Sequence, residues 1–504
     1  MSEEISTKKS KKEEVIDAIL NDPTIRLFTN GREQYMLLYD KELYILNKGL
    51  DDNIIFKIRK LARERRGLTL TDKDLNDIIE ELNAIALDYE VDFKPKQRCF
   101  YNKDDYTFYY FTADEDWKVV KANEEEIRFT QQSKPMFIRS QNTLSSDVNI
   151  IYINNDHLTT LLNKLGYKEY SRYLKVVITA GFIDCISKPY LLFIGDEGST
   201  KSTLADLIKE IIDNGVTKRV SLKRNISEIV LDIDENYVIV FDNISRLTKE
   251  QTDFFCIMYD TGGYTKRQLY TNNKQIRIEG RKFIIFTSIN EPTKEKDFLD
   301  RSRILRFDRR RNNSRLSETE IRNMINAVIA EIRGECISAI AKAIPLIDKK
   351  HEDIANELRD NNLASRSLEW LIIWCEAIAR VYGYEPLEFA KMDKEIYEKG
   401  RGIEDDLFKE VLLLYLEKNN KIEGYPKEIR DLLINSLKEL DLNEDRRIEI
   451  KECLEELNAK KIGKRLQYIK SDLIERGYKV TMKHDRNGNR HIISKEECEV
   501  CEIR

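Results

Sequence analysis

The sequence predicts a multidomain protein built around a parallel α/β sheet, with an α+β part before the sheet and helical parts after it. Three observations predict this fold. The chain has 504 residues, which is room for about three domains of ~150 residues each. Its middle alternates short, continuously apolar runs with helical periodicity, as parallel sheets covered on both faces do. Its last part combines helical periodicity with a β-hairpin signal.

The domain organisation follows from shifts in composition and periodicity along the chain. We expect five segments: a Lys/Glu-rich disordered tail (1–24), an α+β accessory or oligomerisation domain (25–150), the parallel α/β core with two preceding helices (151–315), a helical region ending in a linker at 400–402 (316–403), and a winged-helix DNA-binding domain (404–504).

Composition excludes some classes of protein. The net charge is −5, so any basic surface must be local. No run approaches the ~18 apolar residues of a membrane span, and the start of the chain has no signal-peptide pattern. The eight cysteines lack framework spacing, which is typical of a reducing cytoplasm. Cys498 and Cys501, with His484 and His491 upstream, are only a weak zinc signal.

The α+β part contains strand and helix patterns but no catalytic constellation. Two apolar runs flank Asp40-Lys41 as in a hairpin, two stretches of helical periodicity follow, and two further strands come last. The expected elements are strands at 35–39 and 42–46, helices at 54–65 and 75–89, and strands at 106–111 and 117–120.

In the core, helices are expected at 156–165 and 168–181, before an apolar run at 190–194. That run ends in a loop with the layout of a phosphate-binding loop, in which backbone N–H groups and a helix N-terminus hold a nucleotide's phosphates. Lys201 would reach the outer phosphates, and the Ser202 hydroxyl would bind Mg²⁺. The candidate nucleotide-binding residues are Gly195, Asp196, Glu197, Gly198, Ser199, Thr200, Lys201, Ser202 and Thr203.

One residue of this loop departs from the common pattern. Gly-x-x-x-x-Gly-Lys-Ser/Thr is the usual form, and Thr200 stands here in place of the second glycine. The interpretation therefore depends on the surroundings. Leu204, Leu207, Ile208 and Ile211 follow with helical spacing, which predicts a buried helix face directly after the loop.

The next two apolar runs, 237–241 and 283–286, each lead to polar residues at a strand end. Asp242 at the first end is placed to hold a nucleotide-bound Mg²⁺, although a cap or turn residue is the alternative. Asn243 stands where many ATPases have a carboxylate, and an amide cannot act as a general base. Asn290 at the second end would meet the γ-phosphate or its water.

Two basic features accompany these strands. Arg301, in Asp300-Arg301-Ser302-Arg303, would stabilise charge on a phosphoryl group in a neighbouring subunit, with surface ion pairing as the alternative. Residues 264–278 alternate around Asn272-Asn273 like a hairpin, and 264–282 contain six Lys/Arg against one acid. A basic hairpin of this kind indicates contact with DNA phosphates, and an ordinary solvent-exposed hairpin is the alternative. Its candidate DNA contacts are Lys266, Arg267 and Lys274.

The last third is predicted to be mostly helical. Arg309-Arg310-Arg311 forms a basic rim or a solvated run, and Trp370 and Trp374, four residues apart, are interpreted as core. After 404, helices are expected at 405–418, 426–439, 446–458 and 460–476, with a hairpin at 478–493 turning at Asn487-Gly488.

Charge is concentrated in the final helix and hairpin. Residues 460–490 carry ten Lys/Arg against three acids. This predicts a winged helix-turn-helix on DNA, with protein contacts as the alternative. The candidate DNA contacts in the helix are Lys461, Lys464 and Arg465.

The ordered set of loop, Asp242-Asn243, hairpin and Asn290 resembles the superfamily three helicase domain within the AAA+ ATPases, and most nearly the helicase part of plasmid and viral primase-helicases. Roughly 190–307 carry the resemblance. Further stretches that resemble this group are Phe241-Asp242-Asn243-Ile244-Ser245, Thr261-Gly262-Gly263 and Arg267-Gln268-Leu269-Tyr270-Thr271.

The resemblance implies an AAA+ P-loop core, a hexameric ring of identical chains, ATP and Mg²⁺ as cofactors, hydrolysis between subunits, and a hairpin gripping single-stranded DNA. By that likeness Lys201, Asp242, Asn290 and Arg301 take the Walker A, Walker B, sensor and arginine-finger roles. It also implies plasmid or viral replication in the host cytoplasm, with a primase or polymerase as a further partner.

The leading hypothesis is an ATP-driven DNA helicase or translocase whose winged helix engages duplex or origin DNA. Two rivals stay open. One is an ATP-switched origin-binding initiator without processive unwinding, which Asn243 would suit. The other is a DNA-binding oligomer with a degenerate ATPase core.

Overall fold

The structure is a computed structural model, and it divides the chain into two compact units, 1–397 and 398–504. It describes residues 10–495 apart from 32, 40, 47–51, 93, 132–136, 141, 151–155, 268–274, 308–315, 365–367, 401–406, 441, 443, 456 and 486–487. Only the backbone is described at 52–53, 265–267, 275–279, 445–446, 449, 460–461, 464, 467–468, 471–472, 475 and 488.

The prediction of a disordered tail over residues 1–24 is wrong for residues 11–20, because Lys11–Leu20 form helix α1. Ser10 and Glu13 form a reciprocal capping box that satisfies the first free N–H groups. Val15, Ile16 and Ile19 are buried. The sequence indicated disorder because charged residues dominate here, while three apolar side chains on one face are enough to dock the helix.

The predicted hairpin around Asp40-Lys41 is confirmed, although Asp40 itself lies outside the described residues. Its strands belong to an antiparallel sheet, β1-β2-β3, that packs with α1 and two further helices. The bounds are β1 Ile25–Thr29, β2 Gln34–Leu38, β3 Glu42–Ile45, α2 Asp52–Arg66 and α3 Asp72–Ala86.

A second antiparallel sheet follows and includes the two predicted strands near 106–120. Its order is β4-β5-β6-β7, with bounds Cys99–Asn102, Thr107–Phe111, Lys118–Ala122 and Ile127–Gln131. Phe108, Tyr110 and Val120 of this sheet share one hydrophobic core with the later parallel sheet. The predicted domain boundary at residue 150 therefore divides a continuous hydrophobic core. The sequence did not reveal this, because the pattern within a strand does not indicate which other element the strand packs against.

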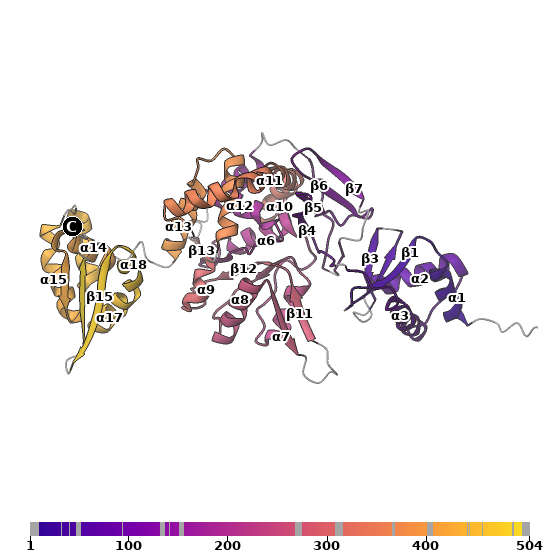
Figure 1. Ribbon diagram of the computed structural model, residues 1–504, viewed down its shortest axis with the longest axis horizontal. Coiled ribbons are helices and arrows are strands. Elements are labelled where there is room, and N and C mark those ends of the chain that lie inside the picture. The colour runs from indigo at the N-terminus through magenta and orange to yellow at the C-terminus, as the bar shows by residue number, and fades with distance from the viewer. Residues whose placement is uncertain are drawn as a thin grey trace, which may run out of the picture. The chain divides into compact units, whose positions relative to one another are not determined.

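The predicted parallel sheet is present, and its order is β13-β8-β12-β9 with every pair parallel. Beyond β9, Val220 forms a parallel bridge with Phe241. Figure 1 shows α6 above the sheet and α8 and α9 below it. The bounds are α4 His157–Lys164, α5 Ser171–Gly181, β8 Tyr190–Gly195, α6 Lys201–Ile212, α7 Ile226–Asp234, β9 Val238–Phe241, α8 Lys249–Thr261, β10 Gly263–Arg267, β11 Gln275–Glu279, β12 Phe283–Ser288, α9 Lys296–Asp300 and β13 Ser302–Phe307.

Helices follow the parallel sheet along the chain, namely α10 Glu318–Asn326, α11 Ile329–Asp360, α12 Glu369–Val381 and α13 Glu388–Gly400, the last of which runs past the end of the first unit. The longest, α11, contains Pro345 in its interior. Trp374 on α12 is buried as predicted, but the prediction for Trp370 is wrong, since 53% of this residue is exposed. Helical spacing placed both tryptophans near one face, but Trp374 packs inside the core against Tyr101 of β4, whereas Trp370 contacts His351 of α11 and stays half exposed.

A buried ion pair ties α13 to the parallel sheet. Arg303 on β13 donates from Nε and Nη2 to the two carboxylate oxygens of Asp393 at 2.8 and 2.6 Å. The Tyr173 hydroxyl donates to the same carboxylate. Both charged partners are at least 94% buried.

Removing one partner of this pair is expected to be costly. Asp393→Ala should lower the free energy of unfolding by about 3–5 kcal/mol, because it leaves the buried guanidinium of Arg303 without its charged partner. Urea unfolding measures the change. The matched control is Glu124→Ala, whose pair with Lys349 has both side chains 62% exposed, and which should cost less than about 0.5 kcal/mol. Equal effects of the two variants would contradict the prediction.

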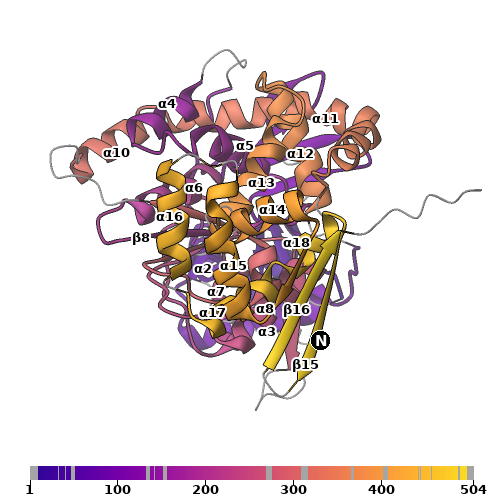
Figure 2. The same ribbon diagram turned by 90° about the vertical axis from the view of Figure 1, so that its left-hand side faces the viewer.

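The second unit contains the predicted helices and the predicted hairpin, which is antiparallel (β15 with β16; Figure 2). Two features differ from expectation: a strand at 421–424 pairs with β16, and the helix expected at 460–476 is two helices. The bounds are α14 Leu407–Asn419, β14 Lys421–Gly424, α15 Pro426–Ser436, α16 Glu444–Glu455, α17 Ala459–Tyr468, α18 Lys470–Glu475, β15 Tyr478–Asp485 and β16 Gly488–Lys495.

Within the described parts of the chain, no helix is both long enough and apolar enough to cross a membrane. Arg309-Arg310-Arg311, the linker residues Arg401 and Gly402, and Asn487 of the hairpin turn lie outside the described residues.

Candidate active site

The candidate site lies at the carboxyl edge of the parallel sheet, where three neighbouring strands end. The loop after β8 begins at Asp196, β9 is followed by Asp242, and β12 is followed within two residues by Asn290. Because β12 lies between β8 and β9, Asn290 follows the strand between the loop and Asp242. Topology alone thus brings together residues up to 94 positions apart in the chain.

The loop uses two left-handed backbone positions before its helix starts. Gly198 has φ 79°, and Thr200, the N-cap of α6, has φ 65°. For a β-branched residue this conformation costs roughly 1–2 kcal/mol, which is why a glycine commonly stands there. The Tyr167 hydroxyl donates to the Thr200 carbonyl at 2.8 Å and holds the position. The unusual residue therefore keeps the backbone path that glycine would take.

Packing around the loop also requires glycine at its first position. A Cβ on Gly195 would stand 2.2 Å from the backbone oxygen of Phe307, at the end of β13. Lys201 is only 8% exposed, and its ammonium donates to the carbonyl of Asp196 at 3.2 Å. The lysine is thus folded back over its own loop, where an anion held by the loop would meet it.

Three donors converge on the carboxylate of Asp242. Oδ1 accepts from Ser202 Oγ at 2.9 Å and from Thr287 Oγ1, while Oδ2 accepts from Arg219 Nη1 at 2.9 Å. Burial alone would raise the pKa of Asp242, but these donors outweigh it and hold the pKa below the usual carboxyl value. Asp242 is therefore ionised near neutral pH.

Thr287 and Arg219 are members of the site that sequence reasoning missed. Thr287 also accepts from the backbone N–H of Asn243 at 2.9 Å, so one hydroxyl fixes two neighbouring positions. Arg219 additionally pairs with Asp206 at 3.1 Å. Thr287 directly precedes the end of β12 and was open to prediction on that ground, whereas nothing local in the sequence marked Arg219.

The donor set suits a magnesium nucleotide. Ser202 Oγ and Asp242 Oδ1 are hard oxygen ligands 2.9 Å apart, and Mg²⁺ commonly takes one or two protein oxygens plus phosphate oxygens and waters. Among the described residues no cluster of three or more His, Cys, Asp or Glu forms a metal cage. Cys498 and Cys501, the weak zinc candidates, lie outside the described residues.

Asn243 and Asn290 lie at the exposed rim of the same edge. Asn243 has φ 54°, a left-handed conformation that asparagine tolerates better than most residues. The backbone oxygen of Asn290 accepts a hydrogen bond from Ser288 Oγ, which fixes the backbone of the turn after β12. Both amides can orient a water molecule or a phosphate oxygen, but neither can take up a proton as a base.

Arg301 is not brought together with these residues. It precedes β13, and its carbonyl bonds to Tyr190 at the start of β8, so it lies at the amino edge of the sheet. Six residue steps of strand, about 20 Å at ~3.3 Å per residue, separate it from the level of Gly195. Arg301 instead pairs with both carboxylate oxygens of Asp260, at 2.9 and 2.7 Å.

The candidate DNA-contact residues lie on the predicted elements. Lys266 and Arg267 are in β10, which pairs with β11 in register Lys266↔Ile276 and Arg267↔Gln275. Lys274 lies outside the described residues. Lys461, Lys464 and Arg465 are in α17 of the second unit. Their contact with DNA stays a prediction.

Comparison with known protein families gives a match in the middle of the chain. Residues 159–366 match the family described as the actinomycete integrative conjugative element replication protein. This stretch is less than half of the chain and contains the loop, Asp242, Asn290 and Arg301. The matched part of the chain is thus similar to a replication protein. No curated protein matches the chain.

Solved structures of the NrS-1 C-terminal region also match. One, an A form apo structure, is 12% identical with a TM-score of 0.36 and covers 75% of this chain and 93% of that one. Another A form apo structure, of residues 305–718, is 11% identical with a TM-score of 0.33 and covers 96% and 100%. Likeness at this level carries no argument about arrangement or activity.

Proposed function

We propose that the protein is an ATP-dependent, ring-forming DNA helicase or translocase that acts in the replication of a plasmid or virus, with an AAA+ superfamily three ATPase core. The observation that carries the proposal is the arrangement at the carboxyl edge of the parallel sheet, where Ser202 and Asp242 are hydrogen-bonded beside Lys201. The similarity of 159–366 to a replication protein family supports the biological setting.

Each residue has a role that its position supports. Backbone N–H groups of the loop and the start of α6 hold the phosphates, and Lys201 neutralises their outer oxygens. Ser202 and the ionised Asp242 would hold a magnesium ion, which would supply charge stabilisation at the phosphates. Thr287 keeps the Asp242 carboxylate oriented, and Asn290 and Asn243 orient the attacking water.

Completion of the site requires a second copy of the chain. Arg301 starts a strand whose other end lies beside the loop, so its side chain is too short to reach its own nucleotide. It can act only on a nucleotide bound by a neighbour. This supports hydrolysis between subunits of a closed ring, for which a hexamer is our proposal.

The hairpin of β10 and β11 is proposed to grip single-stranded DNA. Lys266→Ala with Arg267→Ala, or Lys274→Ala alone, should reduce the stimulation of ATP hydrolysis by single-stranded DNA at least about tenfold and flatten the salt dependence of binding. Hydrolysis without DNA should stay within about twofold. Steady-state ATPase assays with an oligonucleotide titration measure both. Unchanged stimulation in both variants would remove the hairpin from the DNA path.

Two measurements test the main proposal. Mg-ATP at a hundred times its Kd should stabilise the chain by about 2.7 kcal/mol, and DNA should accelerate hydrolysis. No stabilisation by Mg-ATP would instead favour an oligomer with a degenerate ATPase. A strand-displacement assay then separates unwinding from mere binding.

The second candidate is an ATP-switched initiator that binds origin DNA without processive unwinding. Asn243 favours it, because an amide beside Asp242 provides no general base and slows turnover. ATP-dependent DNA binding without strand displacement would decide for the initiator.

A further inference from the structure

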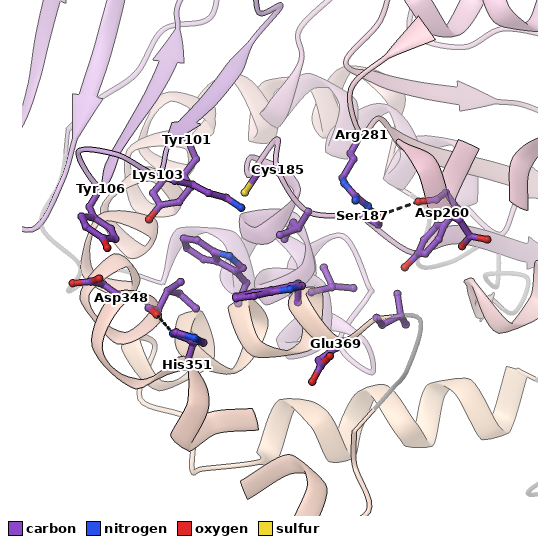
Figure 3. Close-up of a pocket in the computed structure, with 17 residues that line it drawn as sticks. Tyr101, Lys103, Tyr106, Cys185, Ser187, Asp260, Arg281, Asp348, His351 and Glu369 are labelled. Carbon is purple, nitrogen blue, oxygen red and sulfur yellow. Dashed lines mark hydrogen bonds between the residues drawn. The ribbon is translucent and has the colours of Figure 1, made fainter. Parts of the chain in front are cut away.

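A cavity lies away from the phosphate loop. It has a volume of about 630 Å³ and is open to solvent. Its walls come from the β4–β5 turn, the segment before β8, the end of α8, and the facing turns of α11 and α12. Figure 3 shows aromatic and charged side chains lining it together. We call it the Trp370 cleft.

The Trp370 cleft exposes large aromatic surface. Trp370 is 53% exposed and Tyr106 is 45% exposed. Trp370 lies over the His351 ring, with centroids 5.6 Å apart, and Trp374 and Tyr101 pack edge to face behind it. Half-exposed aromatic side chains held by such packing, in a hollow with a polar rim, are typical anchors of protein–protein interfaces.

The cleft lies at the amino edge of the parallel sheet, the same edge as Arg301. Ser187 precedes β8 and Arg281 precedes β12, and both line the cleft. Asp260 connects the two features, since it lines the cleft and also holds Arg301 with both carboxylate oxygens. Whatever meets Arg301 therefore lies next to the cleft.

We propose that the Trp370 cleft is where the neighbouring copy of this chain docks, so that the copy whose nucleotide Arg301 serves is anchored on Trp370. The inference rests on the proposed function, because that function places a second copy against this edge. The anchor deepens it by naming the surface that holds the two copies together.

The charges of the cleft are mixed, as is usual at a protein–protein interface. The carboxylate of Asp260 is paired with Arg301 and that of Glu369 with Arg359, and Arg281 also lines the cleft. The cleft is therefore not a basic surface of the kind that holds a nucleic acid backbone. Lys103 is exposed on the opposite wall and forms no ion pair with any residue that the structure describes.

The edge of the sheet that would face the cleft has matching charges. The phosphate loop of a second copy presents the exposed carboxylates Asp196 and Glu197. An interface that sets these carboxylates against Lys103, with Trp370 as its apolar centre, is complementary in charge.

The test is assembly of the full-length protein with Mg-ATP, followed by sedimentation velocity over a range of protein concentrations. Trp370→Ala should raise the concentration of half-assembly at least tenfold, and Lys103→Glu should raise it as well. The matched control is Phe129→Ala, an aromatic residue 43% exposed on β7, at the far edge of the sheet that begins with β4. The control should assemble like the parent, and all three variants should keep the parent's melting temperature.

A photo-crosslinking amino acid at position 370 provides the second readout. It should give covalent dimers whose cross-linked peptide comes from the loop edge of the other copy. Assembly of Trp370→Ala at the parent's concentrations, cross-links within one chain only, or a protein that stays monomeric with and without nucleotide would each overturn the docking proposal.

Failure of the proposed function has a different signature. A chain that binds no Mg-ATP but assembles through Trp370 would remove the ATPase proposal and keep the interface. A chain that hydrolyses ATP but assembles without Trp370 would do the reverse.

Discussion

Lys201→Ala is expected to abolish ATP hydrolysis, with a fall of at least about 100-fold, because the ammonium is the charge that faces the outer phosphates. The stabilisation of the chain by Mg-ATP should fall with it. Lys201 is 8% exposed, so Lys201→Met, which retains most of the apolar stem, is the variant that separates loss of charge from loss of packing. Hydrolysis by purified protein and thermal shift with Mg-ATP measure the two effects.

The control for Lys201 is Lys164→Ala, which removes an exposed lysine at the end of α4. This variant should hydrolyse ATP like the parent. Parent-like hydrolysis by both Lys201 variants would show that the loop of residues 195–203 is not the nucleotide site.

Arg301→Ala is expected to lower hydrolysis by about 10³-fold or more while nucleotide binding is retained. Each copy binds nucleotide with its own loop, whereas the guanidinium that promotes hydrolysis comes from the neighbouring copy. The substitution should therefore lower the hydrolysis rate without lowering nucleotide affinity. Arg301→Lys should recover little, because a point charge does not replace the planar fork. Fluorescent nucleotide binding and steady-state hydrolysis, measured on the same preparation, distinguish the effects.

Mixing the two inactive variants gives the sharpest result. Lys201→Ala supplies an intact Arg301, and Arg301→Ala supplies an intact loop, so sites formed between unlike copies regain both parts. An equimolar mixture should recover a fraction of the parent's hydrolysis, whereas each variant alone should not. A mixture as inactive as its components would place Arg301 outside the catalytic arrangement, as the surface ion pair with Asp260 alone.

The parts of the site that could be predicted are those encoded locally. The apolar run, loop and amphipathic helix around Lys201 are contiguous, and Asp242 and Asn290 each follow an apolar run directly. The parts that could not be predicted depend on contacts across the chain. Arg219 reaches Asp242 only because its segment bridges to β9.

The fold shows the same division. Helix and strand periods indicated most elements, yet the exposure of Trp370 depends on how α12 meets α11. The first helix was predicted to be disordered because its few apolar residues give only a weak helical pattern in the sequence. They become buried only through contacts with α2 and α3. The strand at 421–424 is short, and its pairing with β16 is visible only in three dimensions.

The proline within α11 interrupts the backbone hydrogen bonding of a helix that contributes both to the core and to the Trp370 cleft. Pro345 has no N–H to donate to the carbonyl of Ala341, so the ladder of hydrogen bonds is weakest there. Both halves contribute buried residues to the core, and Asp348 and His351 in the half after the proline also line the Trp370 cleft. The wall of the Trp370 cleft is therefore built on the part of α11 that directly follows its weakest backbone hydrogen bonding.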